Sequence, residues 1–191
     1  ISKYPSILKY LSNYKEQLTP KENKEDRIGR KPGQYKWYEI QDTVAYYEEF
    51  LKEKIIYAET MRIHKTDVMN FPRFGYDNNK YFCDKTTFII TGQNLKYLLG
   101  IMNSKLGAYL VKEYVTKLDT GGYMMQKVFI EEIPIIKPAE NEKISQAVTK
   151  IIDLNKRNQT KEISEIEKEI DKLVYQLYGL TDEEIEIVER G

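Results

Sequence analysis

The chain changes character after Pro138, and this change limits how the polypeptide can be divided. Residues 1–138 hold 22 Lys and Arg against 17 Asp and Glu, whereas residues 139–191 hold 8 against 13. Fourteen of the 16 tyrosines and the single tryptophan also fall in the first part. A mildly basic, tyrosine-rich part followed by an acidic part predicts two units with different roles, divided between residues 138 and 139.

The acidic part carries a helical pattern. Apolar residues recur there at spacings of three and four, as along one edge of a coiled coil. The two runs are Ile144, Val148 and Ile151, and then Ile163, Ile166, Ile170, Leu173 and Leu177. A polar stretch over 155–161 separates them, and Gly179 is placed to end the second run. The pattern predicts an antiparallel helical hairpin, followed by a short last helix over 181–190.

The tyrosine-rich part combines short helical patterns with short β-type runs. The predicted helices cover residues 4–18, 42–51, 94–103 and 104–118. Runs rich in β-branched and aromatic residues predict strands over 54–59, 86–91 and 127–133. We therefore expect an α+β domain over 1–138, in which the segments near 54, 86 and 127 form a small mixed β-sheet with flanking helices.

Several features bear on where the protein works. No apolar run approaches the ~18 residues that a membrane-spanning helix requires. The first residues, ISKYPSILKY, have neither an initiator methionine nor the layout of a signal peptide, as expected for a piece cut from a longer polypeptide. The single cysteine, Cys83, excludes an internal disulfide and a Cys-rich zinc site. We expect a reducing, cytoplasmic setting.

Candidate catalytic motifs are scarce. The only histidine is His64, and no nucleophile elbow, phosphate-binding loop or dinucleotide-binding glycine motif occurs. The segment NFPRF (70–74) lacks the adjacent prolines of the Asn-Pro-Pro-aromatic motif that holds a flipped adenine in amino-methyltransferases, and we interpret it as a turn. A metal-dependent nuclease site built from Glu22, Asp26 or Asp67 is the enzymatic alternative. We expect the chain itself not to be an enzyme and to hold no metal.

Basic and aromatic side chains interleave in the irregular segments of the tyrosine-rich part. Lys and Arg on loops neutralise phosphates, whereas Arg, Asn and Gln hydrogen-bond to base edges. Glycines such as Gly121 and Gly122 let a backbone come close to a ligand. The pattern indicates a recognition surface, for nucleic acid or for a protein.

Several segments, taken in order, resemble one known family. They are KIIYAE, TTFIIT, LKYLLGIMNSKL, GGYMMQKVFIEEIPI and YQLYGLTDEEIEIVE, with YPSILKYLSNYKEQL and KWYEIQ upstream of them. The chain is similar over nearly its whole length to the TaqI-like C-terminal specificity domain of adenine-N6 DNA methyltransferases. These enzymes belong to restriction-modification systems, including fused type II restriction enzymes. In that family an N-terminal domain binds S-adenosylmethionine and methylates adenine, while this part reads the DNA sequence.

The resemblance implies a target-recognition domain that binds double-stranded DNA and needs no cofactor of its own. S-adenosylmethionine would serve the parent enzyme, whose N-terminal methyltransferase domain is the expected partner. We expect the Gly-Gly loop to face DNA, with Met124 and Met125 packed beneath it and the predicted strand 127–133 holding it in place. The predicted DNA-binding residues are Arg30, Lys31, Arg62, Lys65, Arg73, Lys117, Gly121, Gly122, Tyr123, Gln126 and Lys127.

One alternative assigns function to the helical hairpin. The hairpin also resembles the spacer helices of type I specificity subunits. The chain could therefore be a protein–protein interaction module that docks a partner through the apolar edge with Ile163, Ile166 and Ile170. The same apolar spacing is also explained without a partner, if the edge packs within the hairpin or against the main domain.

Overall fold

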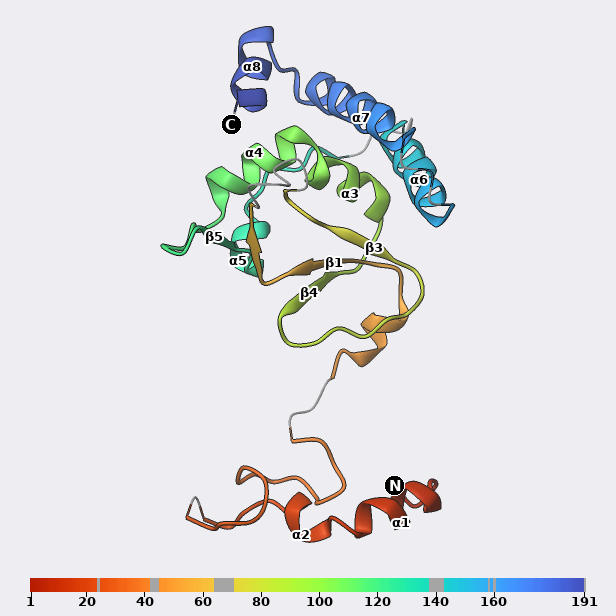
Figure 1. The fold of residues 1–191 in the computed structure, drawn as a ribbon, viewed down its shortest axis with the longest axis vertical. Coiled ribbons are helices and arrows are strands. Elements are labelled where there is room, and N and C mark those ends of the chain that lie inside the picture. The colour runs from red at the N-terminus through yellow and green to blue at the C-terminus, as the bar shows by residue number, and fades with distance from the viewer. Residues whose placement is uncertain are drawn as a thin grey trace. The chain divides into compact units, whose positions relative to one another are not determined.

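The computed structural model describes residues 1–23, 25–41, 45–63, 71–137, 143–157, 159 and 161–190. The chain divides into two compact units, Ile1–Tyr47 and Glu48–Gly191, here called the N-terminal unit and the main unit (Figure 1).

The N-terminal unit contains two short helices and a long loop that closes on itself. The helices are α1 (Pro5–Ser12) and α2 (Lys15–Leu18). They take the place of the single helix predicted over 4–18. The Ser12 hydroxyl donates to the Leu8 carbonyl at 2.8 Å, a bond of the kind that competes with helix continuation. Pro20 and Arg30 form an isolated β-bridge, so the loop returns to the end of α2.

The main unit contains a three-stranded antiparallel sheet with the order β3-β1-β4. Its strands are β1 (Lys54–Ala58), β3 (Gly75–Asp77) and β4 (Thr87–Ile90). Ile55, in the central strand, is fully buried and pairs with Tyr76 on one side and Ile90 on the other. The α+β class is confirmed, as are the strands predicted near residues 54 and 86.

The main unit also contains a separate two-stranded antiparallel ribbon, whose first strand follows directly after β1. It pairs β2 (Thr60–Arg62) with β5 (Gly122–Met124). The strand predicted over 127–133 is wrong, because helix α5 (Lys127–Ile130) occupies this segment. Phe129 and Ile130 turn inward and Lys127 stays exposed, which is the pattern of one amphipathic turn. A short apolar run does not by itself distinguish a strand from a helical turn. The sheet also differs from the prediction, because all its strand pairs are antiparallel rather than mixed.

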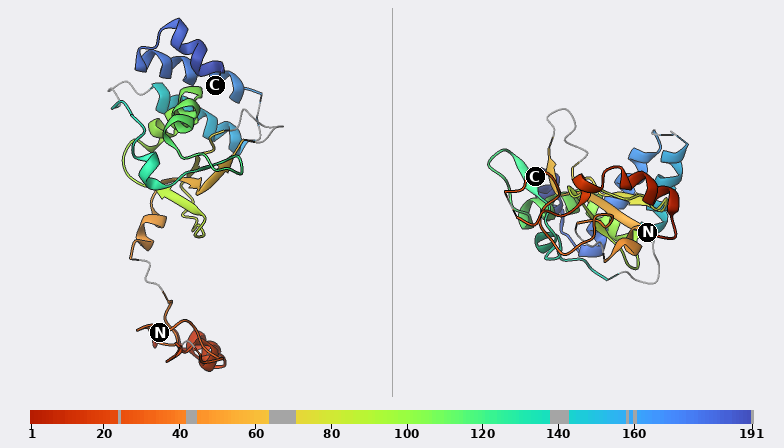
Figure 2. Two further views of the ribbon diagram at one scale, coloured as in Figure 1. Left: turned by 90° about the vertical axis from the view of Figure 1, so that its left-hand side faces the viewer. Right: turned by 90° about the horizontal axis from the view of Figure 1, so that it is seen from below.

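Helices cover one side of this sheet and extend to the C-terminus. They follow the short 3₁₀ helix η1 (Tyr47–Leu51) and are α3 (Leu95–Asn103), α4 (Lys105–Tyr114), α6 (Lys143–Lys156), α7 (Ile163–Tyr178) and α8 (Asp182–Arg190). Figures 1 and 2 show α3 and α4 between the sheet and the α6–α7 pair. The Ser104 hydroxyl accepts the Gly107 N–H at 3.1 Å and so caps α4. Of the helix predicted over 42–51, residues 42–44 lie outside the described residues.

The predicted helical hairpin is confirmed, and its apolar edge packs inside the chain. Ile144, Val148 and Ile170 are all buried and belong to the same hydrophobic core as Ile55. Gly100 of α3 makes the contact close, because a Cβ atom there would lie 2.5 Å from the Ile144 Cγ2 and 3.0 Å from the Val148 Cγ2. The predicted domain boundary after residue 138 stays a prediction.

Within the described part of the chain, no helix has both the length and the apolar character needed to cross a membrane.

Candidate nucleic-acid interface

The ribbon of β2 and β5 places two of the predicted DNA-binding residues, Arg62 and Gly122, side by side. Arg62 pairs with Gly122, and the preceding pair is Met61 with Tyr123. A Cβ atom at residue 122 would lie 3.3 Å from both the Arg62 Cγ and the Thr60 Cγ2, so Gly122 leaves room for the arginine stem to lie over the ribbon. Side chains alternate between the two faces of a strand, which puts Arg62 on the face opposite to Met61.

Arg73 joins Arg62 from a segment eleven residues further along the chain. The Arg73 Nη2 donates to the Arg62 carbonyl at 3.4 Å, and the Arg73 backbone N–H donates to the Met61 Sδ, also at 3.4 Å. Both arginines are exposed. They line a shallow surface concavity of about 550 Å³ with Ala58, Thr60 and Met61, which we call the arginine hollow.

Arg62 and Arg73 have no ion-pair partner among the residues that the structure describes. Both arginines line the same hollow, so an anion bound there interacts favourably with both positive charges. Guanidinium groups bind phosphate oxygens with two parallel hydrogen bonds. The arginine hollow is therefore suited to a phosphate group.

The Gly-Gly loop forms a tight turn that leads into the start of β5. The Gly121 N–H donates to the Leu118 carbonyl at 2.9 Å, and the Leu118 N–H donates to the Gly122 carbonyl at 2.7 Å. Gly121 has a φ of 81°, a conformation that favours glycine. Lys117 is exposed and forms a bridge with Tyr123. Directly paired residues share a face, so Lys117 lies at the ribbon edge on the face opposite to Arg62.

Three predicted residues around this turn have structural contacts, two through the side chain and one through the backbone. Tyr123 is 7% exposed, and its ring packs 4.9 Å from that of Phe71, so the ring supports the turn from inside. Gln126 is half-buried and precedes α5, where its carbonyl accepts the Phe129 N–H. Lys127 is exposed, with its Nζ 3.4 Å from the Glu131 Oε1.

The two methionines of this segment differ in burial. Met125 is fully buried, as expected of a residue beneath the loop, and Met124 is half-buried. The remaining predicted residue of the main unit, Lys65, lies outside the described residues.

Arg30 organises the loop of the N-terminal unit. Its guanidinium donates to the carbonyls of Leu18, Glu39, Lys36 and Trp37 at 2.6, 2.8, 3.2 and 3.1 Å. The same group lies 4.6 Å from the centre of a tyrosine ring in the loop. These contacts occupy most of the donors of the guanidinium, so Arg30 fixes the fold of the loop that carries its neighbour.

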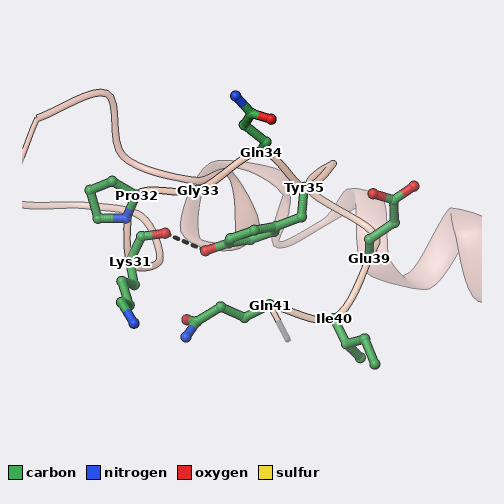
Figure 3. A pocket seen from close by; sticks show the side chains of 8 residues that line it. All are labelled: Lys31, Pro32, Gly33, Gln34, Tyr35, Glu39, Ile40 and Gln41. Carbon is green, nitrogen blue, oxygen red and sulfur yellow. Dashed lines mark hydrogen bonds between the residues drawn. The ribbon is translucent and has the colours of Figure 1, made fainter. Parts of the chain in front are cut away.

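A second hollow, of about 440 Å³, lies in this loop around the ring of Tyr35 (Figure 3). The Tyr35 hydroxyl donates to the carbonyl of Lys31 and so closes the turn over residues 31–35 on one side of the hollow. Gln41 lies beside the tyrosine ring, and Lys31 extends from the rim (Figure 3). Sequence reasoning selected Lys31 but missed Gln34 and Gln41, whose amide groups in the segment QYKWYEIQ were the available signal.

The acidic residues considered for a nuclease do not form a cluster in the described part of the chain. Asp26 accepts the Asn23 N–H at 2.9 Å and closes a local turn. Among the described residues, no group of three or more His, Cys, Asp and Glu side chains is placed to hold a metal ion. His64 and Asp67 lie outside the described residues.

The main unit presents cationic side chains from its ribbon, and the N-terminal unit presents Lys31 from an ordered loop. The family model of the TaqI-like C-terminal specificity domain matches residues 1–135, which is more than half of the chain. The chain therefore belongs to this family, whose members are non-catalytic target-recognition domains. No curated protein matches it.

Proposed function

We propose that the chain is the target-recognition domain of a site-specific adenine-N6 DNA methyltransferase and binds double-stranded DNA. Membership of the specificity-domain family is the observation that carries this proposal. The parent enzyme would use S-adenosylmethionine on a separate N-terminal methyltransferase domain, which is the partner of this chain in the same polypeptide. This chain would orient the duplex so that the target adenine rotates out of the stack into the neighbouring active site.

The arginine hollow is the part of the surface that we assign to the phosphate backbone. Arg62 and Arg73 are exposed, adjacent and without a described carboxylate partner, which suits them to a phosphodiester. Lys117, on the other face of the ribbon edge, and Lys31, in the loop hollow, would contact phosphates other than the one in the arginine hollow. Sequence choice would come from side chains that reach base edges in the major groove, with Gln34 and Gln41 as candidates in the N-terminal unit.

The hairpin alternative has less support. Ile144, Val148 and Ile170 pack against the main unit's own helix α3, so they are not available to a partner. Of the other edge residues, Ile166 is half-buried and also packs against this core, and Ile163 is half-buried.

The test measures the affinity of the 191-residue chain for a labelled mixed-sequence duplex over a range of salt concentrations. Arg62→Ala plus Arg73→Ala should weaken binding to all sequences and lower the salt slope by about 0.9 for each phosphate that the variant no longer neutralises. Arg157→Ala plus Arg190→Ala removes the same charge from two exposed positions, just after α6 and at the end of α8, and should leave the slope unchanged. An unchanged slope in the first variant would remove the arginine hollow from the interface.

A further inference from the structure

The segment that carries Arg73 is held in place from both sides. Its neighbours Phe71 and Phe74 are 6% and 5% exposed, and their rings pack against Tyr123 and Tyr57 at 4.9 and 5.3 Å. Arg73, between them, is exposed. Arg73 is thus the exposed residue between buried neighbours, and its side chain lines the arginine hollow.

Asn103, the last residue of α3, fixes the backbone of this segment. Its Oδ1 accepts the Phe74 N–H at 3.0 Å, and its Nδ2 donates to the Phe74 carbonyl at 2.9 Å. Both polar groups of the carboxamide are thus used on one residue that lies 29 positions away in the sequence. On the opposite side, the Met61 Sδ accepts the Arg73 N–H. The backbone of residues 73 and 74 is therefore clamped between a helix end and the ribbon.

The clamp fixes the backbone position from which the Arg73 side chain starts. From there the Arg73 Nη2 reaches the Arg62 carbonyl at 3.4 Å, and both arginine side chains line the arginine hollow. Two cationic side chains that line one hollow attract an anion bound between them. A pair that is already held together loses less conformational freedom when it binds an anion.

We propose that Asn103 is a positioning residue for DNA binding, which acts by holding Arg73 beside Arg62 so that the two guanidiniums clamp one phosphodiester. This inference rests on the proposed function. Asn103 itself touches no phosphate in this account. Its effect on affinity should therefore pass entirely through Arg73.

A double-mutant cycle tests this coupling with the 191-residue chain and a fluorescein-labelled mixed-sequence DNA duplex. Arg73→Ala should weaken binding about tenfold, and Asn103→Ala should weaken it by a similar factor with the same decrease in salt slope. The double variant Asn103→Ala plus Arg73→Ala should bind within about twofold of Arg73→Ala alone, because the clamp then has nothing to position. Asn155→Ala, an exposed asparagine on α6, serves as the matched control and should bind as the unmodified chain does.

The outcomes separate the inference from the proposed function. Unchanged binding by Arg73→Ala would contradict the assignment of the arginine hollow to DNA and the inference with it. If Arg73→Ala weakens binding but Asn103→Ala has no effect, or the two effects multiply, the positioning role is overturned and the proposed function stands. Asn103→Asp, which keeps the acceptor and removes the donor, replaces Asn103→Ala if circular dichroism shows that variant to be unfolded. If both variants are unfolded, Asn103 serves the fold as a whole and the inference is overturned.

Discussion

Lys54 and Asp77 form an ion pair inside the main unit. Lys54 has no exposed surface and Asp77 is 4% exposed. The lysine also donates to the Phe50 carbonyl at 2.7 Å, while the aspartate accepts the N–H groups of Asn79 and Tyr81 at 2.8 and 3.0 Å. Burial alone would raise the pKa of Asp77, but the Lys54 ammonium and these N–H groups outweigh it and lower the pKa. The pair joins the edge strand β3 to the central strand β1.

The lowered pKa of Asp77 predicts how the free energy of unfolding changes with pH. Because the folded pKa of Asp77 lies below the unfolded value of about 3.9, the carboxylate stabilises the fold above that pH, and this contribution is lost as the pH falls through the folded pKa. Asp77→Asn should lower the free energy of unfolding at neutral pH by about 3 kcal/mol, since it leaves Lys54 charged and buried. It should also reduce the loss of stability in acid.

Urea unfolding at a series of pH values measures both effects. Asp153→Asn breaks an exposed pair with Lys156 at 3.5 Å and provides the control, with an expected change below about 0.5 kcal/mol. Equal acid sensitivity of the Asp77→Asn variant and the unmodified chain would show that this pair does not set the pH dependence.

At the scale of elements, local patterns predicted most helices and two strands. The spacing of apolar residues over 94–103 and the Ser104 cap gave α3 and the start of α4, because these signals lie within one or two turns. The segment after Gln126 was misassigned, since VFI suits a strand by composition and only the fold turns it into α5. The partner of β2 lay in the Gly-Gly segment that was predicted as a loop.

The candidate site shows the same limit. Arg62, Arg73 and Lys117 could be selected from the sequence because basic residues in irregular segments are easily recognised. The meeting of Arg62 with Arg73 and the Asn103 clamp depend on tertiary contacts that no local pattern encodes. Tyr123 illustrates the converse, since a tyrosine in a polar loop suggests exposure while its ring is buried.

The contact between α3 and α6 gives a prediction at this scale. Gly100→Ala gains about 1 kcal/mol of helix propensity but places a methyl group against Ile144 and Val148, which costs about 1–3 kcal/mol in a packed core. Both contacting atoms belong to β-branched side chains, which have few alternative rotamers. Overpacking should therefore win, and the melting temperature should fall.

A second substitution tests whether overpacking against Ile144 causes the loss of stability in Gly100→Ala. Ile144→Ala removes the contacting methyl group, so the two changes together should be less damaging than the sum of the single effects. Thermal unfolding of the three variants measures this coupling. Strict additivity would mean that Gly100 does not set the distance between α3 and α6.

At the scale of the whole molecule, the C-terminal helices α6–α8 and the preceding part of the main unit share one hydrophobic core. The family match ends at residue 135, before α6 begins, yet Ile170 and Val174 of α7 are buried with Ile101 of α3. Polar contacts also cross this junction, where the Lys105 N–H donates to Asp171 at 2.9 Å. Composition indicated the change of character after Pro138 but gave no sign that the acidic helices complete the core of the preceding part.

The central claim is that this chain selects a DNA sequence for a neighbouring methyltransferase domain. Repeated selection of bound duplexes from a randomised DNA pool, followed by sequencing, tests it most directly. We expect enrichment of one short motif that contains an adenine, because the domain would choose the site of adenine methylation. Bound DNA with the same sequence composition as the starting pool would contradict the claim.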